Sequence, residues 1–141
     1  MEDRWDRGRD VIRKSLEFSK AGQKEQALDV VDEALAEAIH ENRGTWALIL
    51  CRHASVLAHS MGDHHRQIHY EERALPFAKE YRFAAYNFAQ LLLKQGQVAR
   101  AEQYANEAFK LSITGTTDAD RDLVAASSGT VGTEYERPAT S

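Results

Sequence analysis

Four histidines lie near the middle of the chain, and imidazole nitrogens are common zinc ligands. His65 and His69 are four residues apart, so on a helix they would share one face and could chelate a metal ion, with His59 and His64 close by in sequence. No cysteine or carboxylate stands at a convincing third-ligand spacing, although Asp63 is near. Because histidines are more often simply exposed at a turn, we predict no metal site and no cofactor.

The single cysteine is the other candidate for chemistry. Cys51 lies in an apolar stretch over residues 48–54, which favours a buried packing thiol over a nucleophile. His53 is two residues further on and would point to another side of a helix. The chain contains no phosphate-binding loop, no glycine-rich dinucleotide fingerprint and no nucleophile elbow. These features predict that the protein is not an enzyme.

Composition narrows the class of protein further. The 141 residues, 43% hydrophobic and 28% charged, suit one ordinary water-soluble domain. The longest uncharged apolar run, residues 46–51, is far too short to span a bilayer, and residues 1–4 begin no apolar signal core. A net charge of −4 argues against general nucleic-acid binding. One cysteine cannot form an internal disulfide, so we predict a reducing, cytoplasmic location.

A glycine-centred pattern recurs three times in the region up to Leu111, which is rich in strong helix formers. Gly22, Gly62 and Gly96 are separated by 40 and then 34 residues. An alanine and a large apolar residue begin twelve residues after each glycine: Ala34-Leu35, Ala74-Leu75 and Ala108-Phe109. A glycine can adopt a positive φ and end a helix tightly, so that the next helix folds back antiparallel. Small alanines at the crossing let the two backbones approach.

The recurring glycines predict a division of this region into six helices, each with apolar residues at spacings of three and four. The fifth helix is typical, with a predicted buried stripe of Phe83, Tyr86, Phe88, Leu91 and Leu92. Pro76 removes a backbone hydrogen bond near the end of the fourth helix, which predicts a bend at residues 72–77. The predicted helices cover residues 6–20, 24–40, 45–60, 64–79, 82–95 and 97–111.

The repeating unit resembles that of the tetratricopeptide repeat family over roughly residues 6–112, and its third copy matches best. The third unit reads Phe88-Ala89, Leu92, Gly96, Ala101 and Ala108. The first unit supplies Ser15, Phe18, Gly22, Ala27, Val31 and Ala34, and the second supplies Ala54-Ser55, Gly62 and Ala74. The departures from the family's pattern are Lys14 in the first unit and Gln67 and Glu71 in the second.

The resemblance implies an all-α fold, an α-solenoid of three antiparallel helix pairs in a right-handed superhelix. The units would cover about residues 6–40, 45–79 and 82–112. One pair cannot bury its own apolar face, so the pairs stack. The family binds many unrelated ligands, and the resemblance therefore implies a protein–protein interaction scaffold without identifying the partner.

In that family the first helix of each pair lines a concave groove. Here the third predicted helix contains Arg52 and no acid, and the fifth contains Arg82 and Lys94 and no acid, whereas the second helix is strongly acidic. We therefore predict a positive groove that binds an acidic peptide, although ordinary solvated surface charges would give the same pattern. The candidate groove residues are Arg9, Arg13, Leu16, Lys20, Arg52, His53, Val56, His59, Tyr86, Asn87, Gln90 and Lys94.

Some members of the family hold the C-terminal carboxylate of a chaperone in a clamp of lysines, asparagines and an arginine. Only Asn87 could bind in a similar way, at a position where arginine is expected, so we do not predict a cochaperone role. The residues at the matching positions are Ile12, Leu16, His53, Phe83 and Asn87.

Small polar residues and glycines follow Leu111, and we predict a mostly disordered tail over residues 113–141. Segment 118–126 is an exception, since it begins with acids and contains Leu123 and Val124, and it could form a short capping helix. Two alternatives stay open for the exposed end of the stack, which is covered either by this segment or by another copy of the chain. The acidic tail could also occupy the basic groove.

Two further functions compete with that of a peptide-binding adaptor. The chain could be a structural module that self-assembles into homo-oligomers, or a regulatory or sensory helper whose effector is a separate chain. The sequence identifies neither the partner, the pathway nor the oligomeric state.

Overall fold

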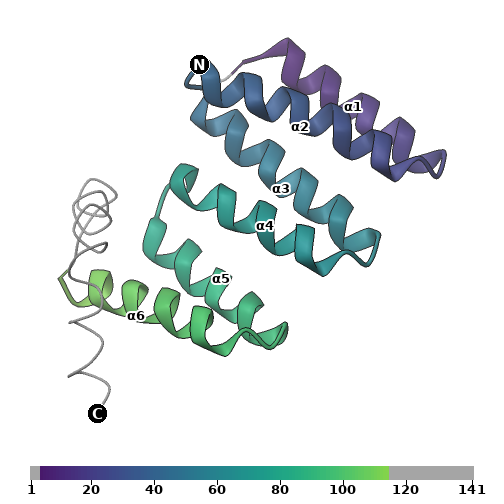
Figure 1. Ribbon diagram of the computed structural model, residues 1–141. Helices are drawn as coiled ribbons and strands as arrows, with labels where there is room; N and C mark the ends of the chain where they lie inside the picture. Colours follow the sequence, from purple (N-terminus) through teal and green to yellow (C-terminus); the bar gives the residue numbers. More distant parts are fainter. Residues whose placement is uncertain (1–3, 115–141) are drawn as a thin grey trace.

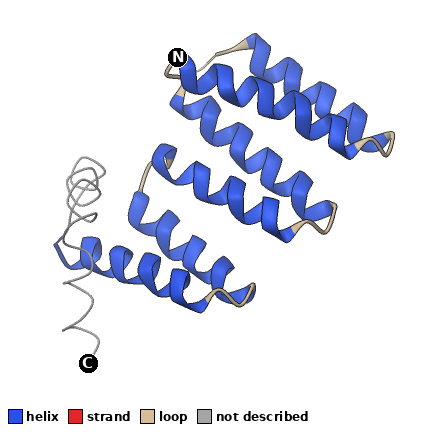
Figure 2. Cartoon of the chain, viewed as in Figure 1, coloured by secondary structure: helices blue, strands red, loops and turns tan. Residues whose placement is uncertain are grey.

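The computed structural model describes residues 4–114, and all regular structure in that range is helical (Figures 1 and 2). The predicted all-α class is thereby confirmed for this part of the chain. The predictions for residues 115–141, including the capping helix at 118–126, lie outside the described residues. The helices are α1 (Asp6–Lys20), α2 (Lys24–His40), α3 (Gly44–Ser60), α4 (His64–Ala74), the 3-10 helix η1 (Leu75–Phe77), α5 (Tyr81–Lys94) and α6 (Val98–Thr114).

Each helix runs back along the one before it, and consecutive helices pack side by side (Figure 1). The packing is extensive between α1 and α2, α2 and α3, α3 and α4, and α5 and α6, and much thinner between α4 and α5. Two helices separated in sequence, α1 and α3, also touch. The structure therefore contains antiparallel helix pairs, of which the last is joined more loosely than the first two.

The same type of turn ends four of the helices, namely α1, α2, α3 and α5. Gly22, Gly62 and Gly96 have φ of +79°, +74° and +80°, as predicted. After each glycine, the next backbone N–H donates to a carbonyl five residues back, as from Gln23 to Phe18 at 2.8 Å. These are Schellman turns, which satisfy the last carbonyls of a helix. The remaining turn of this type, at Asn42 after α2, was not predicted because it contains no glycine. Asparagine also tolerates the left-handed conformation, and its φ here is +58°.

The connection from α4 to α5 differs from the other turns. The fourth helix was predicted to continue to residue 79, but α4 ends at Ala74 and the single 3-10 turn Leu75–Phe77 follows. Pro76 explains the change, because its ring lacks an N–H and clashes with the preceding helical turn. The break falls inside the predicted bend at residues 72–77. After this break α5 begins at Tyr81 and makes few contacts with α4.

The remaining boundaries differ from prediction by a few residues. α3 begins at Gly44 and α5 at Tyr81, each one residue early, and α6 begins at Val98 and continues to Thr114. The tail that was predicted from residue 113 therefore starts no earlier than residue 115.

The buried side chains form two clusters that follow the same division. One spans α1 to α4 and includes Leu28, Leu35 and Leu50, each at most 1% exposed. The other lies mainly between α5 and α6, and Ile68 and Leu75 connect it to the preceding pair. Ala34, Ala74 and Ala108, the alanines of the repeat, are all buried in the second helix of their pair or at its end. Small residues at these sites permit close helix contact.

Polar bonds strengthen the thin junction between the last two pairs. The Tyr104 hydroxyl on α6 donates to Glu72 on α4 at 2.7 Å, and Arg100 forms an ion pair with the same carboxylate at 2.9 Å. The Tyr104 ring also meets Phe88 edge-on, with ring centroids 4.9 Å apart. These contacts fix the position of α6, and hence of its partner α5.

Candidate functional site

The candidate groove residues are nearly all accessible to a partner. Eleven of the twelve are exposed, and the exception is His53, which is half-buried. α1 and α3 are in contact, so their exposed residues lie on adjoining helices. The candidates on α5 belong to the last pair, which is attached through the thin junction. The exposed residues are Arg9, Arg13, Leu16 and Lys20 on α1, Arg52, Val56 and His59 on α3, and Tyr86, Asn87, Gln90 and Lys94 on α5.

His53 joins the two helices of this face and is not free for a ligand. Its Nε2 atom lies 2.6 Å from the Oγ of Ser15, a side chain that is fully buried. The Ser15 hydroxyl donates its proton to the carbonyl of Ile12 at 2.8 Å, so His53 must donate to Ser15. Burial lowers the pKa of His53, which favours the neutral ring. This contact links α3 to α1 through a fully buried side chain.

Exposed apolar side chains lie on all three helices of the face. Leu16 is 47% exposed, Val56 65% and Tyr86 51%. The sequence analysis missed three more, Ile49 on α3 and Phe83 and Leu93 on α5. Phe83 and Tyr86 were predicted to belong to the buried stripe of α5. Helical spacing could have corrected this, because residues 83, 86, 90 and 93 share one side of the helix.

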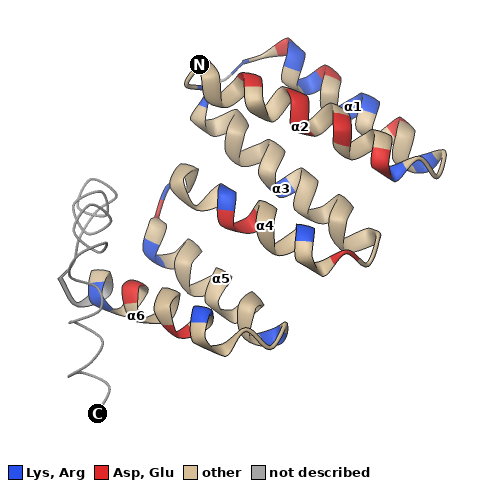
Figure 3. Ribbon diagram, in the orientation of Figure 1, with Lys and Arg blue, Asp and Glu red and all other residues tan. Residues whose placement is uncertain are grey.

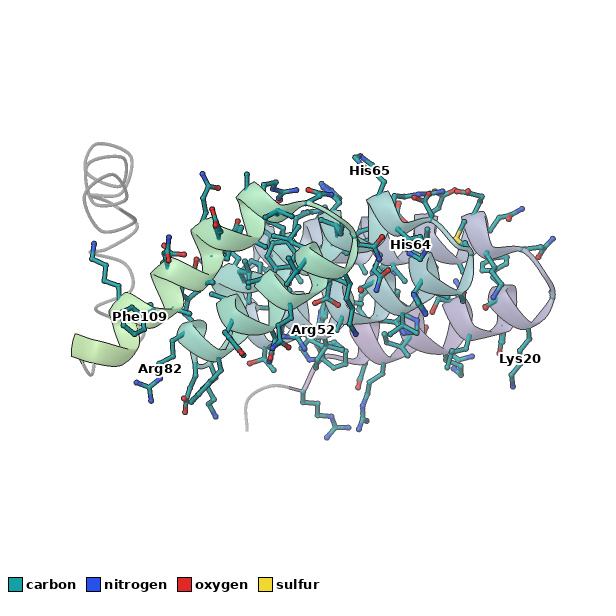
Figure 4. The ribbon with its side chains drawn as sticks, turned by 90° about the horizontal axis from the view of Figure 1, so that it is seen from below. Lys20, Arg52, His64, His65, Arg82 and Phe109 are labelled. Atoms are coloured by element: carbon teal, nitrogen blue, oxygen red, sulfur yellow. The ribbon has the colours of Figure 1, made fainter. Side chains whose placement is uncertain are left out.

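The basic residues of the face differ in whether an acid neutralises them. Within residues 4–114, Arg9, Lys20 and Lys94 have no ion-pair partner. Arg13 binds Asp10 and lies 3.8 Å from Glu17, and Arg52 lies 3.8 Å from Glu71. The predicted positive charge is therefore partly compensated. Lys20 and Arg82 project from one side of the molecule, and His65 from the opposite side (Figure 4).

Acids on the second helices are largely engaged with arginines. The acidic residues follow one another along α2, whereas Arg52 is the only charged side chain of α3 (Figure 3). Arg7 binds Glu37 through two bonds of 2.9 and 2.7 Å. Arg66 binds Glu25 in the same manner, and hydrogen bonding to this guanidinium lowers the pKa of the Glu25 carboxyl. The first pair joins α1 to α2 and the second joins α4 to α2, so both are part of the fold.

The remaining candidates for chemistry are Cys51 and the histidines near the end of α3. Cys51 is fully buried, and burial raises the pKa of its thiol to about 11. His59 and His64 both approach the Oε1 of Gln67, at 3.4 and 3.3 Å. Within residues 4–114, no three histidine, cysteine or carboxylate side chains gather as metal ligands do.

None of the helices between residues 4 and 114 combines the length and apolarity that crossing a bilayer requires. Comparisons with other proteins give no further identification. No family model matches this chain, and no curated protein matches it.

Proposed function

We propose that this protein is a helical-repeat adaptor of the tetratricopeptide type, which binds a peptide or protein partner through the exposed face of α1, α3 and α5. Successive antiparallel pairs, in each of which the same glycine turn joins the two helices, support an α-solenoid of three units. The buried alanines Ala34, Ala74 and Ala108 support it too, because they occupy equivalent positions in the three pairs. A groove between the first helices is part of the proposal.

The proposal rests on one observation, the mixture of side chains on this face. The exposed Leu16 lies on α1 together with Arg9 and Lys20, which have no ion-pair partner in residues 4–114. The exposed Val56 lies on α3, which contacts α1. Apolar anchors gain free energy when a partner covers them, and cations without partners attract carboxylates. An amphipathic segment with acidic and aliphatic residues provides both contacts. It is therefore the partner that fits best.

The test is a titration of labelled peptides that carry Asp or Glu beside Leu at helical spacing, followed by fluorescence anisotropy. We expect Arg9→Glu combined with Lys20→Glu to weaken binding about tenfold or more, since two attractions become repulsions. Lys79→Glu changes one charge at an exposed site between η1 and α5 and should leave the affinity nearly unchanged. Added salt should weaken binding to the wild type more than to the double variant.

A separate variant tests the apolar part of the face. Val56→Asp adds a negative charge at a side chain that is 65% exposed, so it should spare the fold and weaken the peptide complex. Equal affinity of the wild type, the arginine–lysine double variant and Val56→Asp for every bound peptide would refute the proposed face. Binding that is insensitive to the peptide's charge would refute the acidic partner alone.

A further inference from the structure

The last helix pair exposes more large apolar side chains than the other two pairs. The first pair exposes Leu16 and Ile39, and the second exposes Ile49 and Val56. Five large apolar residues of the last pair are each more than half exposed. A following pair would cover one side of α5 and α6, but within residues 4–114 no helix follows α6. The five residues are Phe83, Tyr86, Leu93, Val98 and Phe109.

Part of this surface is hollowed. Arg82, Phe83 and Tyr86 of α5 and Ala108 and Phe109 of α6 line an open pocket of about 220 Å³. This volume is below the roughly 300–1,000 Å³ of typical small-ligand sites, so it suits one or two aliphatic side chains. Arg82 lies over the Phe83 ring, 4.9 Å from its centroid, and has no acidic partner in the described part of the chain. Arg82 and Phe109 project toward the same end of the molecule in Figure 4.

We propose that this end pocket is the docking site of the chain's own segment 118–126. The segment contains Leu123 and Val124, which supply aliphatic side chains for the pocket. Asp118, Asp120 and Asp122 precede them and supply carboxylates for Arg82. The match of charge and of apolar character favours this occupant over a second copy of the pocket, because the pocket lining contains Arg82 but no carboxylate to pair with it.

The position of the segment in the chain makes docking geometrically simple. Phe109 lies five residues before Thr114, where α6 ends, which is about 8 Å along a helix. Three residues separate Thr114 from Asp118, so these two positions can lie up to about 13 Å apart when the chain is extended, and the chain can turn back over the last helical turn. A tethered segment also has a high effective concentration near its site, so a modest interaction suffices.

This inference concerns the end of the stack and does not rest on the proposed partner-binding function. Tyr86 belongs to both surfaces, so a docked tail would also limit access to the α5 part of the face. The test below follows the tail and the end pocket directly, without any peptide partner. Its failure would therefore leave the proposed function standing.

The test compares nuclear magnetic resonance spectra of full-length variants. Leu123→Ser with Val124→Ser removes the two aliphatic side chains proposed to fill the pocket and changes none of residues 4–114. Relative to the wild type, we expect this double variant to show changed amide shifts near Phe83 and Phe109. We also expect its amide hydrogen exchange in α5 and α6 to be at least about threefold faster. Val131→Ser removes an apolar tail residue outside the segment and should change neither.

A reciprocal variant tests the charge match. Arg82→Gln should shift the amides of residues 118–122, whereas Lys79→Gln should not. Spectra of α5 and α6 that are unaffected by the Leu123 and Val124 changes would overturn the proposal. Shifts that disappear on dilution, together with a lower sedimentation coefficient, would also overturn it and assign the pocket to a second copy of the chain.

Discussion

The substitution Gly8→Ala tests the packing at the start of the first helix pair. Gly8 lies in α1 between two indole rings, those of Trp5 and Trp46, whose centroids are 5.9 Å apart. A Cβ atom at residue 8 would lie 2.6 Å from Cε3 of Trp46 and 2.8 Å from Cε3 of Trp5. Carbon atoms in contact prefer about 3.5–4.0 Å, so the added methyl group overlaps both rings by about 1 Å.

Two opposing effects determine how much Gly8→Ala changes the free energy of unfolding. Alanine favours a helix over glycine by about 0.5–1 kcal/mol, and an added methyl group in a filled site costs about 1–3 kcal/mol. The rings have little room to move, because each tryptophan is only 9% exposed and Arg43 stacks on Trp5 at 4.9 Å. We therefore take the upper half of the cost and expect a net loss of about 1–2 kcal/mol in the free energy of unfolding.

Gly44→Ala is the matched control. Residue 44 begins α3, and a Cβ there would meet its nearest neighbour, a ring carbon of Phe77, at an ordinary 3.8 Å. This variant should be as stable as the wild type or up to about 1 kcal/mol more stable. Urea unfolding followed by far-ultraviolet circular dichroism measures both variants, and tryptophan near-ultraviolet signals report on the rings. A Gly8→Ala protein at least as stable as the wild type, with unchanged tryptophan signals, would refute the reasoning.

Three further predictions follow from single side chains. Burial lowers the pKa of His53, so the folded state resists its protonation; stability should fall from about pH 7 to pH 5, and His53→Gln should reduce that loss in thermal melts. Tyr104→Phe removes the donor to Glu72 and should cost about 1 kcal/mol in urea unfolding, and an unchanged midpoint would show that the junction bond contributes nothing. The buried thiol of Cys51, whose pKa is raised to about 11, should react with a thiol reagent at pH 8 about a hundredfold more slowly than in urea; equal rates would contradict its burial.

The sequence by itself determined the number of helices and most of their ends in residues 4–114. These features are local, because a glycine with positive φ or a proline in a helix acts through its own backbone and a few neighbours. Gly22, Gly62 and Gly96 ended their helices where predicted, and Pro76 bent the chain inside the expected interval. Asn42 was missed because its left-handed conformation is optional, whereas glycine adopts it without cost.

Tertiary structure decided which residues of each helix are available. Phe83 and Tyr86 are apolar residues that were predicted to be buried, but no helix of residues 4–114 covers them. Histidine is a polar residue that is common at protein surfaces, but the contact of α1 with α3 places the His53 ring within hydrogen-bond distance of Ser15. Burial and ion pairing depend on which helices meet, and those contacts join residues about 30 to 40 positions apart, beyond the reach of any local pattern.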